Sequence, residues 1–154
     1  MANVVYGVAS WFNILCRIWG TIAVQGKTVK SYLLEEIPES VNVFPSAISF
    51  LESVDANYSL GGPSTGVYQG KTEFHLTGSL VRSQMGFVMQ FPDKVIAAAA
   101  TKLTLDGKVV NFRIVNPGSI KPVQLTWGNE QEHFGLIVPW IVQENQSGKY
   151  TVSA

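Results

Sequence analysis

Apolar and polar side chains alternate with a period of two in three segments of this chain, and this pattern constrains the fold more than any other feature. In one segment Thr72, Phe74 and Leu76 alternate with polar neighbours. Successive side chains of a β-strand point to opposite faces of its sheet, so the alternation predicts strands that are buried on one face. They cover residues 72–81, 109–115 and 120–127, and a fourth strand is predicted over residues 134–142.

The last of these strands is apolar on both faces. Phe134, Leu136, Val138 and Trp140 share one face, while the other face carries Gly135, Ile137, Pro139 and Ile141. Because proline has no N–H group to donate, Pro139 predicts an edge strand or a bulge. A second apolar face needs a second cover, and a neighbouring subunit can supply it.

Two other segments show the spacing of three and four residues that is typical of amphipathic helices. The first predicts a helix over residues 4–20 that ends near Gly20. The second predicts a helix over residues 91–105 that Gly107 ends. Its expected buried stripe consists of Ile96, Ala99, Ala100 and Leu103.

The remaining segments are shorter or less regular. Strands are expected at residues 29–34 and 47–54. Residues 55–70 are rich in glycine and have almost no periodicity, so we expect a long loop or a hairpin tip there.

The order of these elements predicts a single α+β domain. A mainly antiparallel sheet, covered on one face by two helices, is expected over residues 1–145, with the glycine-rich loop or hairpin extending from it. Residues 146–154 are polar and are expected to form an extended tail.

Composition excludes several classes of protein. Eleven basic residues balance eleven acidic ones, and only 14% of residues are charged, whereas a nucleic-acid binder that works through a basic face has excess lysine and arginine. A disordered chain would be less apolar than the 46% found here. Soluble domains carry about 25% charged residues, so the low charge suggests that other subunits, or lipid, cover part of the surface.

Residues 4–24 are the one candidate for a membrane span. Ser10, Asn13 and Arg17 recur near its middle at helical spacing, and a central arginine costs roughly 2.5–3.5 kcal/mol on insertion scales. The segment also has no basic region of the kind that begins a signal peptide. We therefore expect an amphipathic helix of a cytosolic protein, with no membrane contact.

Residues suited to catalysis or metal binding are few. Glu73 and His75 share one strand face, but one histidine and one carboxylate fall short of the three protein ligands of a catalytic zinc site. We expect this pair on a solvated strand face and His133 in a solvated turn. Cys16 is expected to be a buried structural thiol. No catalytic residue, metal site or cofactor is therefore predicted.

Other residues are better candidates for contacts between subunits. Tryptophan is enriched at interfaces, and Trp11 lies off the main apolar stripe of its helix. Basic residues later in the chain could meet an acidic edge of a second copy, formed by Glu35, Glu36, Glu39, Glu52 and Asp55. The candidate interface residues are Trp11, Gly61, Gly62, Gly66, Tyr68, Lys102, Lys108, Arg113 and Trp140.

The order of elements, together with several short motifs, resembles the tail terminator (tail-completion) family of long-tailed bacteriophages and gene transfer agents. An opening amphipathic helix is followed by a proline-containing stretch, EEIPESVNVFPSAISF, and then by a strand, TEFHLTGSLV. A helix with alanines follows, VIAAAATKLTLDGKV, and the chain closes with the strands of PVQLTWGNEQEHFGLIVPWIVQEN. The resemblance covers about residues 4–145. Its first part is carried by Pro38, Ser40, Phe44, Pro45, Ala47 and Ile48.

This resemblance implies a structural role in the virion and no catalysis. Members of the family form a ring, typically of six subunits, at the head-proximal end of the tail tube. The ring stops tube polymerisation and offers a surface to the head-completion or connector protein. DNA passes through its lumen without sequence-specific binding, and the subunits are assembled in the host cytoplasm.

Three other interpretations stay open at the level of sequence. A tail tube or other neck subunit would carry a similar sheet, helix and long loop. A small module could bind an apolar ligand between sheet and helix. A metal-dependent enzyme could use Glu73, His75 and His133.

Overall fold

A computed structural model describes residues 8–57, 65–78, 82–128 and 131–145. These residues form three helices and eight strands, with two short 3-10 turns at Arg82–Gln84 and Pro117–Ser119. The helices are α1 (Val8–Trp19), α2 (Met85–Met89) and α3 (Phe91–Ala99). The strands are β1 (Ala23–Val24), β2 (Lys27–Thr28), β3 (Lys30–Ser31), β4 (Ser46–Asn57), β5 (Thr65–Thr77), β6 (Asn111–Ile114), β7 (Pro122–Trp127) and β8 (Gln131–Asn145).

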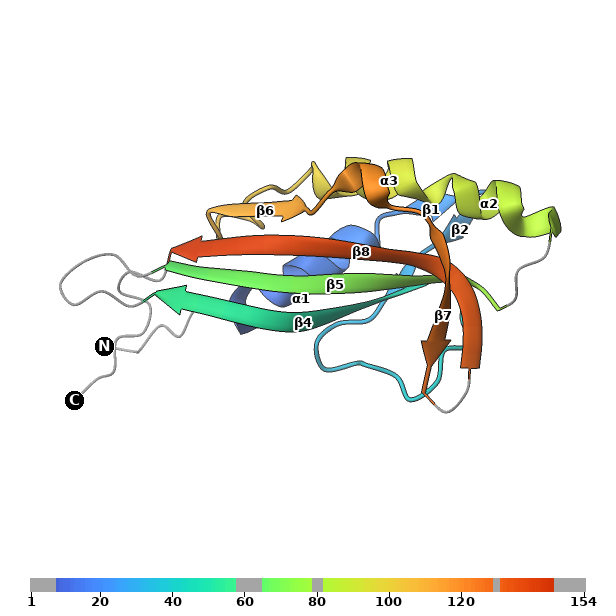
Figure 1. Cartoon of the computed structure of the whole chain (residues 1–154), viewed down its shortest axis with the longest axis horizontal. Helices are drawn as coiled ribbons and strands as arrows, with labels where there is room; N and C mark the ends of the chain where they lie inside the picture. The colour runs from blue at the N-terminus through green and yellow to red at the C-terminus, as the bar shows by residue number, and fades with distance from the viewer. Residues whose placement is uncertain (1–7, 58–64, 79–81, 129–130, 146–154) are drawn as a thin grey trace.

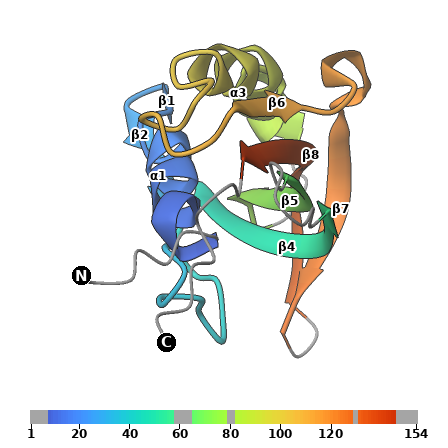
Figure 2. The same ribbon diagram turned by 90° about the vertical axis from the view of Figure 1, so that its left-hand side faces the viewer.

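Six of the strands form one sheet, which confirms the predicted α+β class and its mainly antiparallel character. The strand order is β3-β4-β5-β8-β6, and β7 also pairs with β8 (Figure 1). All pairs are antiparallel except β3 with β4. Strand β8 is therefore central, with β5 along one side and β6 and β7 along the other. Figure 2 shows how the sheet curls from β4 round to β7.

Pro139 was predicted to lie in an edge strand, but β8 has neighbours on both sides. The proline itself lies where the pairing along one side of β8 is interrupted. Residues 111–114 of β6 pair with β8 up to Trp140, and β7 resumes the pairing at Leu136. The carbonyl of Pro139 accepts a hydrogen bond from the Val115 N–H (2.9 Å). In an antiparallel strand the N and the carbonyl of one residue point to the same side. The missing N–H of Pro139 thus faces the break between β6 and β7.

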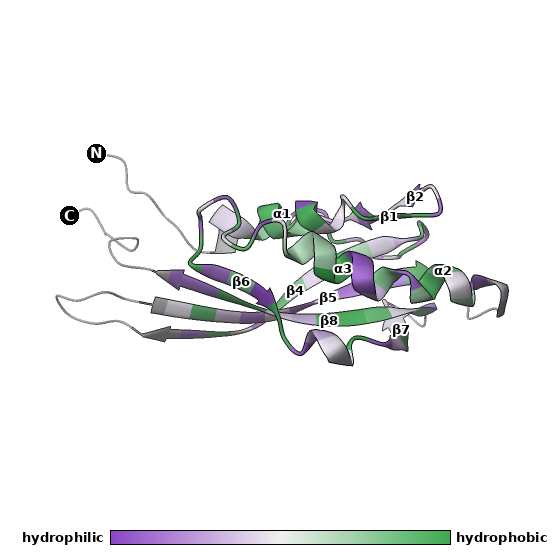
Figure 3. Cartoon of the chain, turned by 90° about the horizontal axis from the view of Figure 1, so that it is seen from above, coloured by the Kyte–Doolittle hydropathy of each residue, from purple (hydrophilic) through white to green (hydrophobic). Residues whose placement is uncertain are grey.

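Helices α1 and α3 cover one face of this sheet, as predicted (Figure 3). The core between the layers is aromatic: Trp19 meets Phe74 edge-on at 5.4 Å and Phe112 at 6.1 Å between ring centroids. Cys16 is fully buried in the same cluster, and burial raises the pKa of its thiol to about 12. The expectation of a buried structural thiol is therefore confirmed.

The second predicted helix is shorter than expected and is buried on a different stripe. It ends at Ala99, and just beyond this end both the N–H (3.1 Å) and the hydroxyl (2.6 Å) of Thr101 donate to the carbonyl of Ala98. Its buried residues are Phe91, Val95, Ala98 and Ala99, whereas Ile96, Ala100 and Leu103 are exposed. Only Ala99 of the predicted stripe was right, since the packing angle against α1 and the sheet selects a stripe shifted by one residue.

The predicted glycine loop is mostly strand where the structure describes it. Strand β4 runs to Asn57 and β5 begins at Thr65, so the ends of the supposed loop are paired; the rest, with Gly61 and Gly62, lies outside the described residues. Gly66 pairs with Ala56 and Glu144 inside the sheet. Glycine at position 70 leaves room for the Trp140 ring, which a Cβ there would strike.

Three further expectations concern the ends of the chain and the first strands. The strand expected at residues 29–34 is confined to Lys30–Ser31. The first helix is described only from Val8, and the predicted tail at residues 146–154 lies outside the described residues. Among the described helices, none is both long and apolar enough to span a membrane.

Candidate functional site

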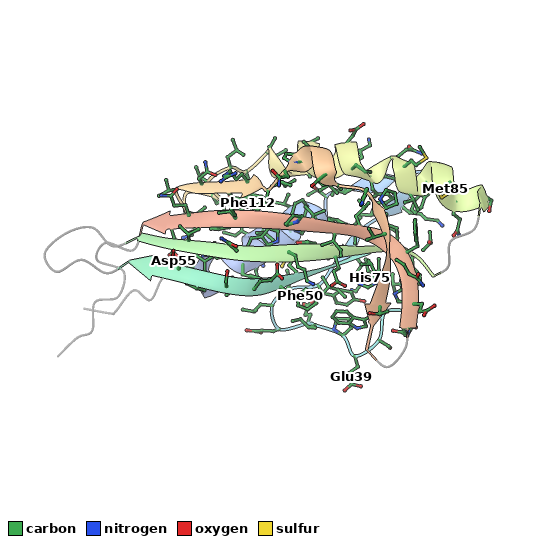
Figure 4. The ribbon with its side chains drawn as sticks, viewed as in Figure 1. Glu39, Phe50, Asp55, His75, Met85 and Phe112 are labelled. Atoms are coloured by element: carbon green, nitrogen blue, oxygen red, sulfur yellow. The ribbon has the colours of Figure 1, made fainter. Side chains whose placement is uncertain are left out.

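The chemically richest cluster is a chain of four polar side chains on the outer face, the face of the sheet opposite the helices (Figure 4). Lys71 Nζ lies 3.4 Å from Glu73 Oε2, and Glu73 Oε1 lies 3.1 Å from His75 Nε2. His75 Nδ1 then lies 2.9 Å from His133 Nδ1. The metal-dependent interpretation of the sequence groups three of these residues, and the structure brings all three into one chain.

Strand geometry explains why these residues meet. Lys71, Glu73 and His75 are two residues apart on β5 and therefore share one face. Strand β8 runs beside them and places His133 across a register shift between His75 and Thr77. Gly135 lies opposite His75, and its missing Cβ lets β8 approach the carbonyl oxygen of Phe74 on β5.

Two segments cover this chain from outside. The ring of Trp127, at the end of β7, meets His75 edge-on at 5.8 Å, and Phe44 meets His133 at 4.8 Å. Trp127 Nε1 donates a hydrogen bond to the carbonyl of Pro38 (3.1 Å), and the N–H of Val41 donates one to Gln131 Oε1 (2.9 Å). These bonds tie residues 38–45 to the curled end of the sheet.

Both expectations about the histidines are therefore wrong. His75 is 0% exposed instead of lying on a solvated strand face, and His133 is 6% exposed within β8 instead of in a solvated turn. The physical reason is the cover that β7 and residues 38–45 add to the outer face at this end.

One set of tautomers satisfies both hydrogen bonds of this chain with the Glu73 carboxylate ionised. His75 donates from Nε2 to the Glu73 carboxylate, so its Nδ1 accepts the bond that His133 donates from Nδ1. These bonds occupy both nitrogens of His75 and one of His133. In the described part of the chain, no group of three or more His, Cys, Asp or Glu residues is placed to hold a metal ion. The arrangement is that of a hydrogen-bonded link between β5 and β8.

We expect this chain to make the fold sensitive to acid. Burial and the charge of His75 lower the pKa of His133 below its ordinary 6.5. Burial raises the pKa of Glu73, but the hydrogen bonds and charges of His75 and Lys71 outweigh it and hold that pKa below 4.5. In both cases the unfolded chain binds the proton more readily, so the free energy of unfolding should fall as pH drops below 6.5 and fall again below 4.5.

Urea unfolding between pH 8 and pH 4 measures this effect, with a slope of at most about 1.4 kcal/mol per pH unit for one group. His133→Gln serves as the comparison, because an amide can still donate to His75 but does not titrate. The variant should lose the part of the slope that begins near pH 6.5. An identical slope in both proteins would contradict the assignment.

Three of the candidate interface residues lie in the core instead, which corrects the sequence prediction. Trp11, Tyr68 and Trp140 are 0%, 3% and 0% exposed. Trp11 meets Tyr68 at 5.3 Å and Trp140 at 5.9 Å, both edge-on. Their side chains are enclosed by this one chain and are not available to another subunit. Gly66 is likewise buried.

The charged candidates Lys102, Lys108 and Arg113 are exposed, but they do not form one basic patch. Lys102 forms an ion pair with Asp106 (2.7 Å) in the turn after α3, whereas Arg113 lies on β6, shortly after Lys108. The acidic residues divide in the same way. Glu52 and Asp55 lie on β4, and Glu35, Glu36 and Glu39 lie between β3 and β4.

One surface feature was missed by the sequence analysis: a groove between α1 and α3, here called the helix groove. It has two neighbouring hollows, of about 320 Å³ and 140 Å³, that share Thr21 and Thr101. Basic side chains border it at Arg17, Lys94 and Lys102. The spacing of Ile14, Ile18 and Thr21 was the available signal, but only the packing of α3 turns that helix face into a groove.

A comparison of the chain with protein-family models found no match. A comparison with curated proteins found none either.

Proposed function

We propose that this chain is a structural subunit of a ring at the head-proximal end of a bacteriophage tail. The ring ends polymerisation of the tail tube and joins the tail to the head-completion or connector protein. The proposal starts from the sequence resemblance to tail terminators, and the α+β fold with two helices on one sheet face agrees with what that resemblance implies.

The observation that carries a self-assembling role is the outer face of β8. Helices cover only the opposite face, while Ile137 is 39% exposed and Pro139 and Ile141 are half-buried among the described residues. Elsewhere among the described residues, Leu51, Val54, Leu103 and Val110 are also exposed. Packing against identical copies would remove this apolar surface from water.

Balanced charge also supports a ring of identical subunits. A head-to-tail contact joins two different patches of the same chain, and repeated rotation closes the ring. Glu35, Glu36 and Glu39 lie between β3 and β4, whereas Lys94 lies on α3 and Lys102 follows it, so a head-to-tail contact can join these two places. A net charge of zero suits a lumen through which DNA passes without being held. The assembly is a homo-oligomer of about six copies, built in the host cytoplasm, with no catalytic role.

Analytical ultracentrifugation and negative-stain microscopy of the purified chain test this proposal. We expect a closed particle of about six subunits with a central opening, and no growth at higher concentration. Open filaments would favour a tail tube subunit instead. A monomer at every concentration would contradict both.

A second observation tests the place in the tail. Tail tube and head-completion genes should flank this gene, and the ring should bind one end of tubes assembled from that neighbouring tube protein. Rings that leave both tube ends bare would contradict a terminator.

A further inference from the structure

The helix groove combines apolar and basic side chains. Ile14 and Ile18 of α1 and Ala97 of α3 supply its apolar lining. Lys94 and Lys102 lie along the α3 side, and Arg17 lies on the α1 side. Asp106, which pairs with Lys102, is the one acidic residue among those that line the two hollows. Three basic side chains against one acidic side chain leave the groove positive.

The chain also carries a segment with the complementary chemistry. Residues 34–39, Leu-Glu-Glu-Ile-Pro-Glu, contain three acidic residues and no basic one. The side chains of Leu34 and Ile37 are 38% and 47% exposed, so they lie outside the core of their own subunit. We call this stretch the acidic segment.

The acidic segment is held in shape by its own subunit. The N–H of Leu34 donates to Asn13 Oδ1 of α1 (2.8 Å), and the N–H of Glu36 donates to the carbonyl of Leu33 (2.9 Å). A segment that is already ordered loses less conformational freedom when it binds. It is therefore suited to enter a groove on another molecule.

Helix α1 lies between the two features: its Ile14 and Ile18 line the groove toward α3, and its Asn13 holds the acidic segment on the other side (Figure 2). Helix α3 is at the top of Figures 1 and 2, and the loop between β3 and β4 runs along the bottom; Figure 4 marks Glu39 there. A segment at the bottom of one copy can meet a groove beside α3 of the next copy without a symmetric contact. This is the head-to-tail arrangement that a ring requires.

We propose that the helix groove binds the acidic segment of a second copy of this chain. Leu34 and Ile37 enter the apolar lining, while the glutamates face Lys94 and Lys102. The inference rests on the self-assembly proposed above and assigns the two surfaces that make it.

The other pair of charged patches fits such a contact less well. Glu52 and Asp55 lie on β4, and Lys108 and Arg113 lie at β6, so these patches would have to join sheet edge to sheet edge. The edge of β6 is already in use, because the N–H of Phe112 donates to the carbonyl of Leu103 (2.7 Å). The helix groove has no such internal occupant among the described residues.

Charge exchange across the contact tests the proposal. One variant reverses the acidic segment with Glu35→Lys, Glu36→Lys and Glu39→Lys, and the other reverses the groove with Lys94→Glu and Lys102→Glu. Each should raise the concentration at half-assembly by about tenfold or more at low salt, since exposed charge pairs are individually weak but act together here. An equimolar mixture of the two variants should associate again, because the reversed segment of one faces the reversed groove of the other.

Two controls make charge reversals of the same kind elsewhere, with one substitution fewer in each case. Glu52→Lys with Asp55→Lys alters the acidic patch on β4, and Lys121→Glu alters an exposed lysine outside the groove. Both should assemble like the unmodified chain. Circular dichroism melts should be alike for all variants, because every altered side chain is exposed.

The outcomes separate this inference from the proposed function. Closed rings that both reversals leave intact, or variants that do not associate when mixed, would overturn the groove contact and leave the ring standing. If the chain forms open filaments, and charge reversal breaks and mixing restores them, the groove contact is supported but the role of a terminator is contradicted. An unmodified chain that stays a monomer at every concentration would overturn both.

Discussion

Gly135→Ala is expected to lower the free energy of unfolding by about 3 kcal/mol, at the upper end of the cost of overpacking a core. A Cβ at this position would strike the carbonyl oxygen of Phe74 on the neighbouring strand. Backbone cannot move aside as a flexible side chain does, so β5 and β8 would have to separate. The His75–His133 hydrogen bond lies beside this point and would be strained by the same movement.

Urea denaturation of the monomer measures this effect, and Gly86→Ala provides the matched control. Gly86 lies in α2, where an added methyl group would have no atom within 4 Å, and alanine is the better helix former by about 1 kcal/mol. The control should be as stable as the unmodified protein or slightly more so. Equal stability of the Gly135 variant would show that the strands tolerate the extra methyl group.

Trp11→Ala is expected to cost about 3–5 kcal/mol, the usual range when a buried tryptophan is removed from a core. Its ring is enclosed by Tyr68, Trp140 and Phe12, with centroids 5.3 to 6.0 Å away. The loss should appear in unfolding of the monomer and should not depend on protein concentration. Met89→Ala, at a side chain that is 65% exposed, should change stability by less than about 0.5 kcal/mol.

This experiment also separates the core position of Trp11 from the interface position that the sequence suggested. A variant that folds with normal stability as a monomer but no longer assembles would restore the interface interpretation. A variant whose monomer is destabilised would agree with the burial of the ring.

Strands could be predicted from the sequence where the cause was local. Alternation over residues 72–77 reflects one buried face, and the stretch 134–142 was recognised as a strand that is apolar on both faces; β5 and β8 include these stretches. The stretch around Gly66 and Gly70 has no such alternation, yet it is strand. A residue far away in sequence explains the glycine at position 70, because the ring of Trp140 fills the space that a Cβ there would need.

The candidate site was harder to predict because its environment is built from distant segments. Glu73 and His75 could be placed on one strand face from their spacing alone. Their burial depends on Trp127 and on residues 38–45, which are distant in sequence and cover them at the curled end of the sheet. Trp11 was misplaced for a similar reason: α1 packs against both the sheet and α3, so it is buried over a wider arc than one apolar stripe indicates.

The position of β8 in the sheet bears on how the protein is made. Ribosomes deliver β4, β5, β6 and β7 before β8, yet β6 and β7 have their sheet pairing only through β8. During synthesis the emerging chain can pair β3, β4 and β5, but β6 and β7 must wait until the last described strand has left the exit tunnel. Nascent chains interrupted before residue 131 would therefore leave unpaired strands exposed to the aggregation and proteolysis that meet incomplete polypeptides.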